Sequence, residues 1–124
     1  MPILYAQSSG SQQFFYQPSP INGLSLTVPE GFNRQAVITL NVPSPYTINF
    51  GGGGSGGWFG ISVDGVTLPM FASYSYNSQI LSSNPGRVPT TLVVAVTLGL
   101  KPQKIVALAS NCVIDSPASL SAVI

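Results

Sequence analysis

The stretch Gln35-Ala-Val-Ile-Thr-Leu-Asn-Val42 alternates in character at every position except Val37. Positions 36, 38, 40 and 42 are all apolar, whereas positions 35, 39 and 41 are polar. A period of two residues is typical of a β-strand that buries one of its faces. Pro43 and Pro45 follow, and because proline cannot donate to a sheet ladder, the strand is predicted to end there.

Similar patterns along the chain predict about eight short strands separated by turn-rich segments. The expected strands are Ile3–Gln7, Gly23–Val28, Gln35–Val42, Trp58–Asp64, Val66–Tyr76, Thr91–Leu98, Ile105–Ala109 and Ala118–Ile124. Asp64-Gly65 is typical of a type I′ hairpin turn, which needs positive φ at both positions, and Pro69 in the return arm indicates an edge or a bulge. Residues 1–124 are therefore expected to form one all-β domain, a sandwich or jelly roll.

Two connections are rich in turn residues. Residues 51–57 contain six glycines and one serine, which fits either a surface loop or a close approach of the backbone to another group. Residues 82–89 form a second connection between expected strands.

The expected strands Thr91–Leu98 and Ile105–Ala109 are apolar on both faces. In an antiparallel protein of this size, a second sheet or another subunit must cover the outer face of such a strand. Few charges are present to oppose association, so the pattern favours a symmetric oligomer.

The chain of 124 residues has four basic residues, three acidic residues and no histidine, for a net charge of +1. Four scattered cations cannot neutralise a run of phosphates, so no nucleic-acid partner is expected. General acid–base pairs, activated nucleophiles and metal ligands need side chains that are nearly absent. We therefore expect no catalytic residue, no metal and no cofactor, and we expect the protein not to be an enzyme.

Cys112 is the only cysteine, so no intrachain disulfide is possible, and it is expected to be a small buried hydrophobe. The first residues lack the basic and apolar regions of a secretory signal, and the longest apolar run is too short to cross a membrane. The expectation is a soluble protein made in the cytoplasm, without membrane insertion, that reaches an outside ligand by non-classical release or surface display.

The remaining chemistry suits a neutral, hydroxyl-rich ligand. Ser, Asn and Tyr both donate and accept hydrogen bonds, Arg donates as a fork, and aromatic faces pack on the C–H patches of sugar rings. Residues 73–78 (SYSYNS) and 82–87 (SSNPGR) supply all three kinds of group. An ordinary strand with outward polar side chains and a solvated turn would also have this composition. Arg87 fits this ordinary strand-and-turn interpretation least. The prolines on either side of it stiffen its backbone, which lowers the entropy cost of ordering it when a ligand binds.

Four segments resemble, in order and spacing, a family of bacterial lectin domains. They are Leu40-Asn-Val-Pro-Ser-Pro-Tyr46, Tyr74-Ser-Tyr-Asn-Ser78, Gly86-Arg-Val-Pro89 with the following Leu92–Val96, and Ile114-Asp-Ser-Pro-Ala-Ser-Leu-Ser-Ala122. The family is the TNF-like, fucose-binding domain found at the N-terminus of a two-domain bacterial superlectin. The resemblance implies a jelly-roll β-sandwich assembled as a homotrimer, with calcium-independent sugar sites between subunits.

The resemblance also assigns residues to the sugar site. Arg87 matches an arginine that grips the sugar hydroxyls, Tyr46 matches a contacting tyrosine, and Ser75-Tyr76 match a Thr-Tyr pair. Ser83-Asn84 match a Ser-Thr pair, with Pro85 inserted after them, and either Trp58 or Phe59 matches a tyrosine wall. Leu108 stands where the family has a second arginine.

The sequence therefore predicts a lectin for fucose, a fucosylated glycan or a related monosaccharide, directed at cell-surface glycoconjugates. The alternative is a structural or adhesion trimer that has the same sandwich but no sugar pocket. A TNF-like protein ligand for a receptor is a third hypothesis, resting on analogy of fold alone.

Overall fold

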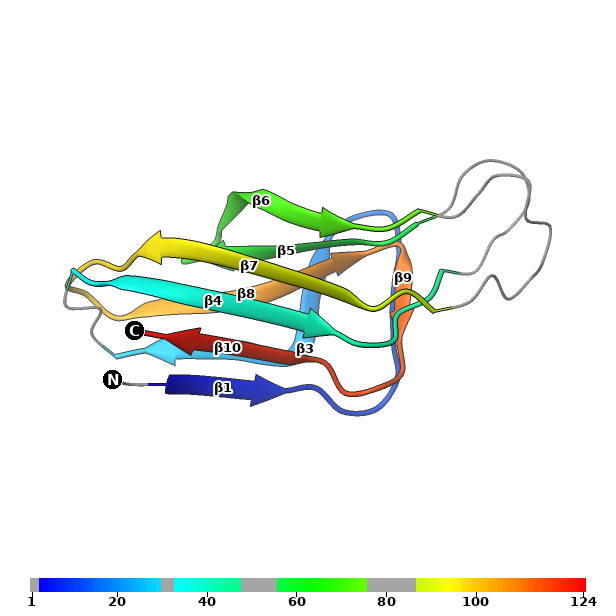
Figure 1. The fold of residues 1–124 in the computed structure, drawn as a ribbon, viewed down its shortest axis with the longest axis horizontal. Coiled ribbons are helices and arrows are strands. Elements are labelled where there is room, and N and C mark those ends of the chain that lie inside the picture. Colours follow the sequence, from blue (N-terminus) through cyan, green and yellow to red (C-terminus); the bar gives the residue numbers. More distant parts are fainter. Residues whose placement is uncertain (1–2, 30–32, 48–55, 76–86) are drawn as a thin grey trace.

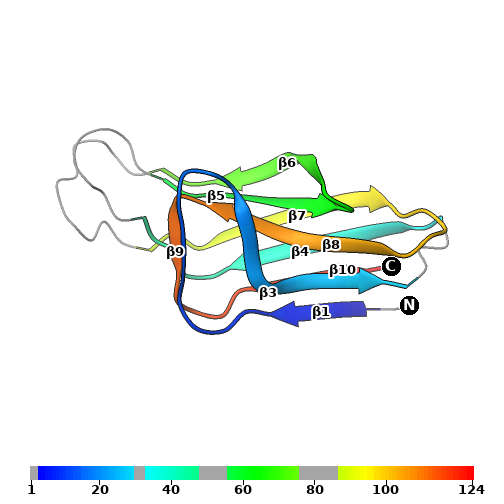
Figure 2. The same cartoon turned by 180° about the vertical axis from the view of Figure 1, so that it is seen from behind.

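The computed structural model describes residues 3–29, 33–47, 56–75 and 87–124. Two four-stranded sheets face each other, and a short third pair of strands lies across one end of the sandwich (Figures 1 and 2). All strand pairs are antiparallel. The described residues form no helix, so none of them makes a helix able to span a membrane.

Strand order defines the two large sheets. The first, called the β4 sheet, has the order β1 (Ile3–Gln7), β10 (Ser119–Val123), β4 (Gln35–Val42) and β7 (Thr90–Thr97). The second, called the β8 sheet, has the order β3 (Ser19–Val28), β8 (Gln103–Ser110), β5 (Trp58–Val63) and β6 (Val66–Ser73). The end pair consists of β2 (Gln12–Phe14) and β9 (Cys112–Ile114). Apart from the β5–β6 hairpin, neighbours in the two large sheets come from distant parts of the chain, as in a double-sheet jelly roll.

The core lies between the two sheets and follows from the alternation in sequence. In the β4 sheet, Ile38 pairs with Ala122 on one side and with Val94 on the other, and all three are buried. In the β8 sheet, Ile61 pairs with Ala107, and both are buried. The inner faces of both sheets thus meet in one apolar layer, and the alternation predicted for β4 is confirmed residue by residue.

The hairpin between β5 and β6 is also confirmed. Asp64 has φ of 52° and Gly65 has φ of 83°, the positive values that a type I′ turn needs. The Asp64 carboxylate accepts a hydrogen bond from the backbone N–H of Lys104, 2.9 Å away, which ties the turn to β8. Strand β6, which carries Pro69, is an edge strand as predicted.

Three strands, β2, β3 and β9, differ from the predictions. Strands β2 and β9 were not expected, because three residues are too few to display a period. Strand β3 begins at Ser19 rather than Gly23, since a shift in its pairing with β8 between Pro20 and Ser25 interrupts the alternation.

Cys112 is buried as expected, and burial raises the pKa of its thiol to about 12. Residues 51–55 and 82–86 of the two predicted connections lie outside the described residues.

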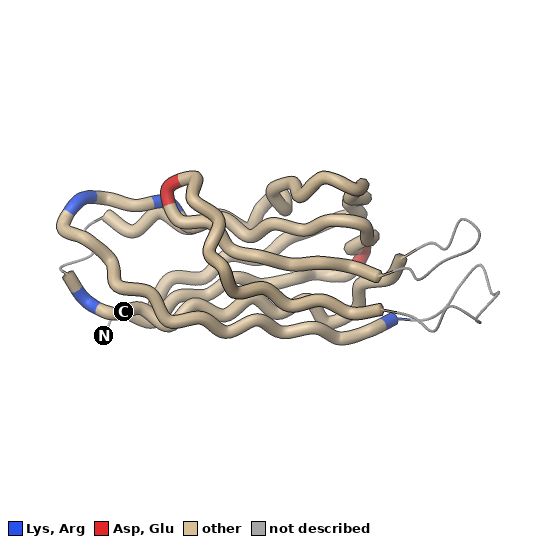
Figure 3. The backbone as a smooth tube through the Cα atoms, turned by 90° about the horizontal axis from the view of Figure 1, so that it is seen from above, with Lys and Arg blue, Asp and Glu red and all other residues tan. Residues whose placement is uncertain are grey.

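One end of the sandwich collects the segments of interest. Strand β4 ends there, β7 begins there, and Val42 pairs with Thr90. Strand β5 begins at the same end and β6 finishes there, with Trp58 paired to Ser73 (Figure 1). Among the residues that the structure describes, the charged ones lie towards the two ends of the sandwich and leave its middle uncharged (Figure 3).

Candidate functional site

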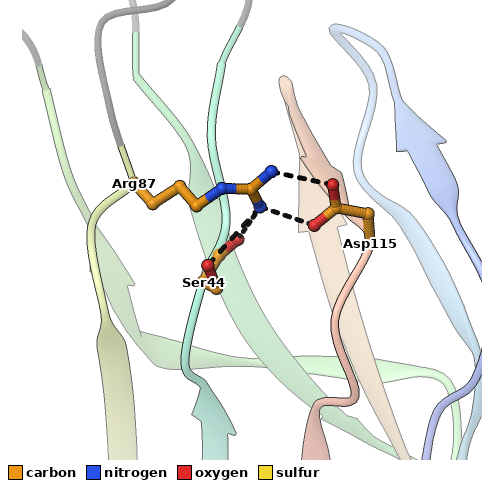
Figure 4. Close-up of polar contacts among 3 residues, drawn as sticks. All are labelled: Ser44, Arg87 and Asp115. Atoms are coloured by element: carbon orange, nitrogen blue, oxygen red, sulfur yellow. Dashed lines mark hydrogen bonds and ion pairs between the residues drawn. The ribbon is translucent and has the colours of Figure 1, made fainter.

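Arg87 lies just before β7 and is held by a carboxylate and a carbonyl group (Figure 4). Its Nη1 and Nη2 atoms donate to the two carboxylate oxygens of Asp115, at 2.5 and 2.9 Å. Nη1 also donates to the carbonyl oxygen of Ser44, at 3.0 Å. A two-point contact between a planar fork and a carboxylate fixes orientation as well as distance, so the guanidinium has a defined direction.

Tyr46 provides an aromatic face beside this guanidinium. The Arg87 Cζ atom lies 4.7 Å from the centroid of the Tyr46 ring, within the range of a cation–π contact. The Tyr46 backbone exchanges two hydrogen bonds with Val113, at 2.7 and 3.2 Å. The backbone N–H of Val88 donates to the Pro45 carbonyl at 3.1 Å, which links the backbone segments that carry Arg87 and Tyr46. We call Ser44, Tyr46, Arg87 and Asp115 the arginine cluster.

The arginine cluster orients groups more than it stabilises the fold. The side chains of Arg87 and Asp115 are 45% and 29% exposed, and ion pairs this exposed contribute only about 0–1 kcal/mol. The hydrogen bond from Arg87 holds the pKa of Asp115 below its usual value, so the carboxylate stays charged at neutral pH. Removing Arg87 is therefore expected to leave the sandwich folded.

Trp58 forms a second aromatic surface on the outer face of the β8 sheet. It begins β5, and its ring stacks on Phe71 of β6, with centroids 6.2 Å apart and planes 27° apart. The ring also lies across Gly60, where a Cβ atom would collide with it. We call Trp58, Gly60 and Phe71 the tryptophan cluster. Ser75, which follows β6, is exposed at the same end of the sheet.

Phe59 requires a correction. Its side chain is fully buried in the core and packs near Tyr74, with ring centroids 6.1 Å apart. Side chains alternate along β5, so when Phe59 points inward, Trp58 must point outward. Of the two residues proposed for the aromatic wall, only Trp58 can meet a ligand at the surface.

The structure brings together some of the predicted residues and not others. Arg87 and Tyr46, which lie outside the strands of both large sheets, are in contact, whereas Trp58 lies on the outer face of the β8 sheet. The predicted residues Tyr76, Ser83 and Asn84 lie outside the described residues and remain predictions. Within one copy of the chain, the arginine cluster and the tryptophan cluster therefore belong to different surfaces.

Asp115 and Phe71 are the residues that sequence reasoning missed. Asp115 stands in an Asp-Ser-Pro segment that is typical of a turn, but it is also one of only three acidic residues and so a natural partner for one of four cations. Phe71 had no signal of its own, because an apolar residue in a strand is expected. In the part of the chain that the structure describes, no three His, Cys, Asp or Glu residues gather to hold a metal ion.

These features define an all-β sandwich domain with polar and aromatic groups at one end and few charges. The chain belongs to the family described as "Bc2l-C, N-terminal domain", which matches residues 5–123. That family is the TNF-like lectin domain predicted from the four sequence segments. A search of curated proteins finds no match to the chain.

Proposed function

We propose that the protein is a trimeric lectin that binds fucose or a related monosaccharide terminus in pockets between subunits. The observation that carries this proposal is the arginine cluster, in which a guanidinium of fixed direction lies over a tyrosine ring. Cell-surface glycoconjugates are the proposed targets, and no cofactor is needed.

The arginine cluster suits a neutral sugar on chemical grounds. A guanidinium donates to adjacent hydroxyls at fixed spacing, and a tyrosine face packs against the C–H groups of a pyranose ring. Asp115 offsets the charge of Arg87, so the cluster has little net field to attract anions. The predicted residues Ser75, Tyr76, Ser83 and Asn84 would complete the hydrogen bonds.

Two observations support placing the pockets between subunits. The arginine cluster lies in the segments just outside β4, β7 and β9, and the tryptophan cluster lies on the outer face of the β8 sheet; we place each pocket where the arginine cluster of one copy meets the tryptophan cluster of the next. The outer face of the β4 sheet also carries exposed large apolar side chains and no charge: Ile3 and Tyr5 project from β1, Val37 from β4 and Val93 from β7, with Ser121 and Thr39 between Tyr5 and Val93. Exposed apolar side chains on an uncharged face of this kind favour an interface. A closed ring of copies would cover this face.

Substitution of Arg87 tests the sugar site. Arg87→Ala is expected to abolish binding on a glycan array, because the fork that reads the hydroxyls is lost, while the trimer persists on sedimentation. Lys101→Ala is the matched control, since it removes an exposed cation at the opposite end of the sandwich. Array binding that survives in Arg87→Ala would overturn the site assignment.

One observation favours the alternative of a structural or adhesion trimer. Arg87 is already engaged by Asp115 and Ser44, as it would be in a purely structural ion pair. A structural role predicts that the wild-type protein binds no glycan at any protein concentration. It also predicts that Arg87→Ala lowers the melting temperature, whereas the lectin proposal predicts lost binding at an almost unchanged melting temperature.

A further inference from the structure

A depression lies at the end of the sandwich closed by β2 and β9, apart from both clusters. Its volume is about 240 Å³. Phe14 and Val113, which are buried, form part of its floor. Its rim carries two of the most exposed aromatic side chains of the described residues, Phe15 at 69% and Tyr16 at 85%. We call this hollow the end depression.

The polar groups around the end depression are amides and hydroxyls. Gln13 and Asn111 carry the amides and Thr47 a hydroxyl, and none of the residues that line the hollow is charged. Among the described residues, nothing hydrogen-bonds to the Gln13 side chain or to Oδ1 of Asn111. An uncharged lining of this kind gives no attraction to phosphates, carboxylates or cations. It matches a ligand that is neutral, bears hydroxyls and has one apolar face.

The backbone beneath the end depression is held in place before any ligand arrives. The Asn111 N–H donates to the Phe15 carbonyl at 2.7 Å, and the Thr47 hydroxyl donates to the Asn111 carbonyl at 2.6 Å. The Asn111 side chain donates to the Gly56 carbonyl at 2.8 Å, and its φ of 55° is one that asparagine tolerates. Binding would therefore order few groups, which favours affinity for a small ligand.

The end depression is separate from the arginine cluster although the two share a segment. Tyr46 contacts Arg87, whereas its neighbour Thr47 contacts Tyr74 and Asn111. The consecutive side chains thus serve different surfaces, and Arg87 and Asp115 take no part in the lining of the hollow.

We propose that the end depression is a second saccharide-binding site that takes one neutral pyranose ring within a single subunit. Phe15 and Tyr16 pack against the C–H face of the ring, and the Gln13 and Asn111 amides bind its hydroxyls. The hollow is wide enough for several water molecules. The sugar ring displaces them, and its hydroxyls take over the hydrogen bonds that the water molecules made. Each subunit then has a site that does not depend on Arg87 or on a neighbouring copy.

An NMR titration of the full chain tests this proposal. The probes are the methyl glycosides of L-fucose, D-galactose, D-glucose and D-mannose, and the readouts are the side-chain amide signals of Gln13 and Asn111. At least one glycoside is expected to shift both signals in the wild-type protein and equally in Arg87→Ala. Signal shifts that are retained in Arg87→Ala distinguish this site from the proposed inter-subunit site, so either proposal can fail alone.

Two substitutions on the rim sharpen the test. Phe15→Ala and Tyr16→Ala are each expected to raise the dissociation constant for that glycoside about tenfold, because an aromatic face is lost. Leu100→Ala is the matched control, since Leu100 is 67% exposed but lies in the connection between β7 and β8. Circular dichroism checks that each variant is folded.

Three results would overturn the proposal. One is that no probe shifts the Gln13 and Asn111 signals at millimolar concentration. Another is that the shifts occur but are unchanged in Phe15→Ala and Tyr16→Ala. A third is that these variants change only the oligomeric state, which would make the end depression an interface between copies.

Discussion

Asp115 determines where Arg87 points. The carboxylate accepts from both terminal nitrogens of the guanidinium, and the Ser44 carbonyl accepts from one of them. Because the pair is exposed, its contribution to folding is small, but its effect on the direction of Arg87 is large. The arginine was identifiable from its proline-flanked segment and from the family resemblance. Its carboxylate lies 28 residues further along the chain, and only the fold brings the two together.

Asp115→Asn tests this positioning role through the pH profile. Wild-type sugar binding should be constant from pH 8 to pH 5, because the chain has no histidine to titrate there. The pKa of Asp115 in the folded protein is below 3.8, so its contact with Arg87 is complete above that pH and is lost as the pH falls through the lowered pKa. Binding should therefore fall only below about pH 4.

Asp115→Asn separates the effect of Asp115 on the direction of Arg87 from unfolding of the protein at low pH. An asparagine accepts through only one oxygen, so binding by Asp115→Asn should be about tenfold weaker at pH 7, as expected when a charge-assisted hydrogen bond is lost. Its remaining binding should not show the acid-side fall, as measured by titration with methyl fucoside at each pH. If the variant binds as tightly as the wild type at pH 7, Asp115 has no positioning role.

At the scale of elements, hydrophobic periodicity predicted the long strands and missed the short or irregular ones. Strands β1 and β4 have the predicted bounds, because five to eight residues with one buried face give a clear alternation. Strands β2 and β9 have three residues each, so their existence depends on pairing with each other rather than on a local pattern. These two strands build the end depression, which explains why nothing in the sequence pointed to it.

Gly60→Ala tests the tryptophan cluster. A methyl group at position 60 would collide with the Trp58 ring, which must then leave its place beside Phe71. Because Trp58 is the only tryptophan, its fluorescence should change in the variant. Sugar binding at the inter-subunit site should weaken severalfold, as expected for a displaced aromatic face.

Gly65→Ala is unsuitable as a control because its φ of 83° would add strain, so Ala72→Gly in β6 serves instead. Unchanged fluorescence and binding in Gly60→Ala would remove the tryptophan cluster from the site.

At the scale of the whole molecule, the outer face of the β4 sheet is uncharged and carries exposed apolar side chains, which suits it to contact between copies. The described charged residues lie towards the ends of the sandwich, where they do not interfere with contacts made across its middle (Figure 3). Strand β7 contributes Val93 to this face, beside Thr39 of β4. A face of this kind can be buried between copies without trapping an unpaired charge.

Val93→Glu therefore tests the trimer. Val93 is 56% exposed in a single copy, so the substitution should leave the fold intact by circular dichroism. In the trimer, the new carboxylate would be buried without a partner, at a cost large enough to separate the copies. Sedimentation velocity should show the mass of one chain, whereas Leu100→Glu, with a similarly exposed apolar residue in the connection between β7 and β8, should remain a trimer. The separated copies should lose the inter-subunit sugar site and keep the end depression, since the first needs two copies and the second needs one. A Val93→Glu protein that remains a trimer would exclude this face as the interface, and the pockets between subunits would have to be placed elsewhere.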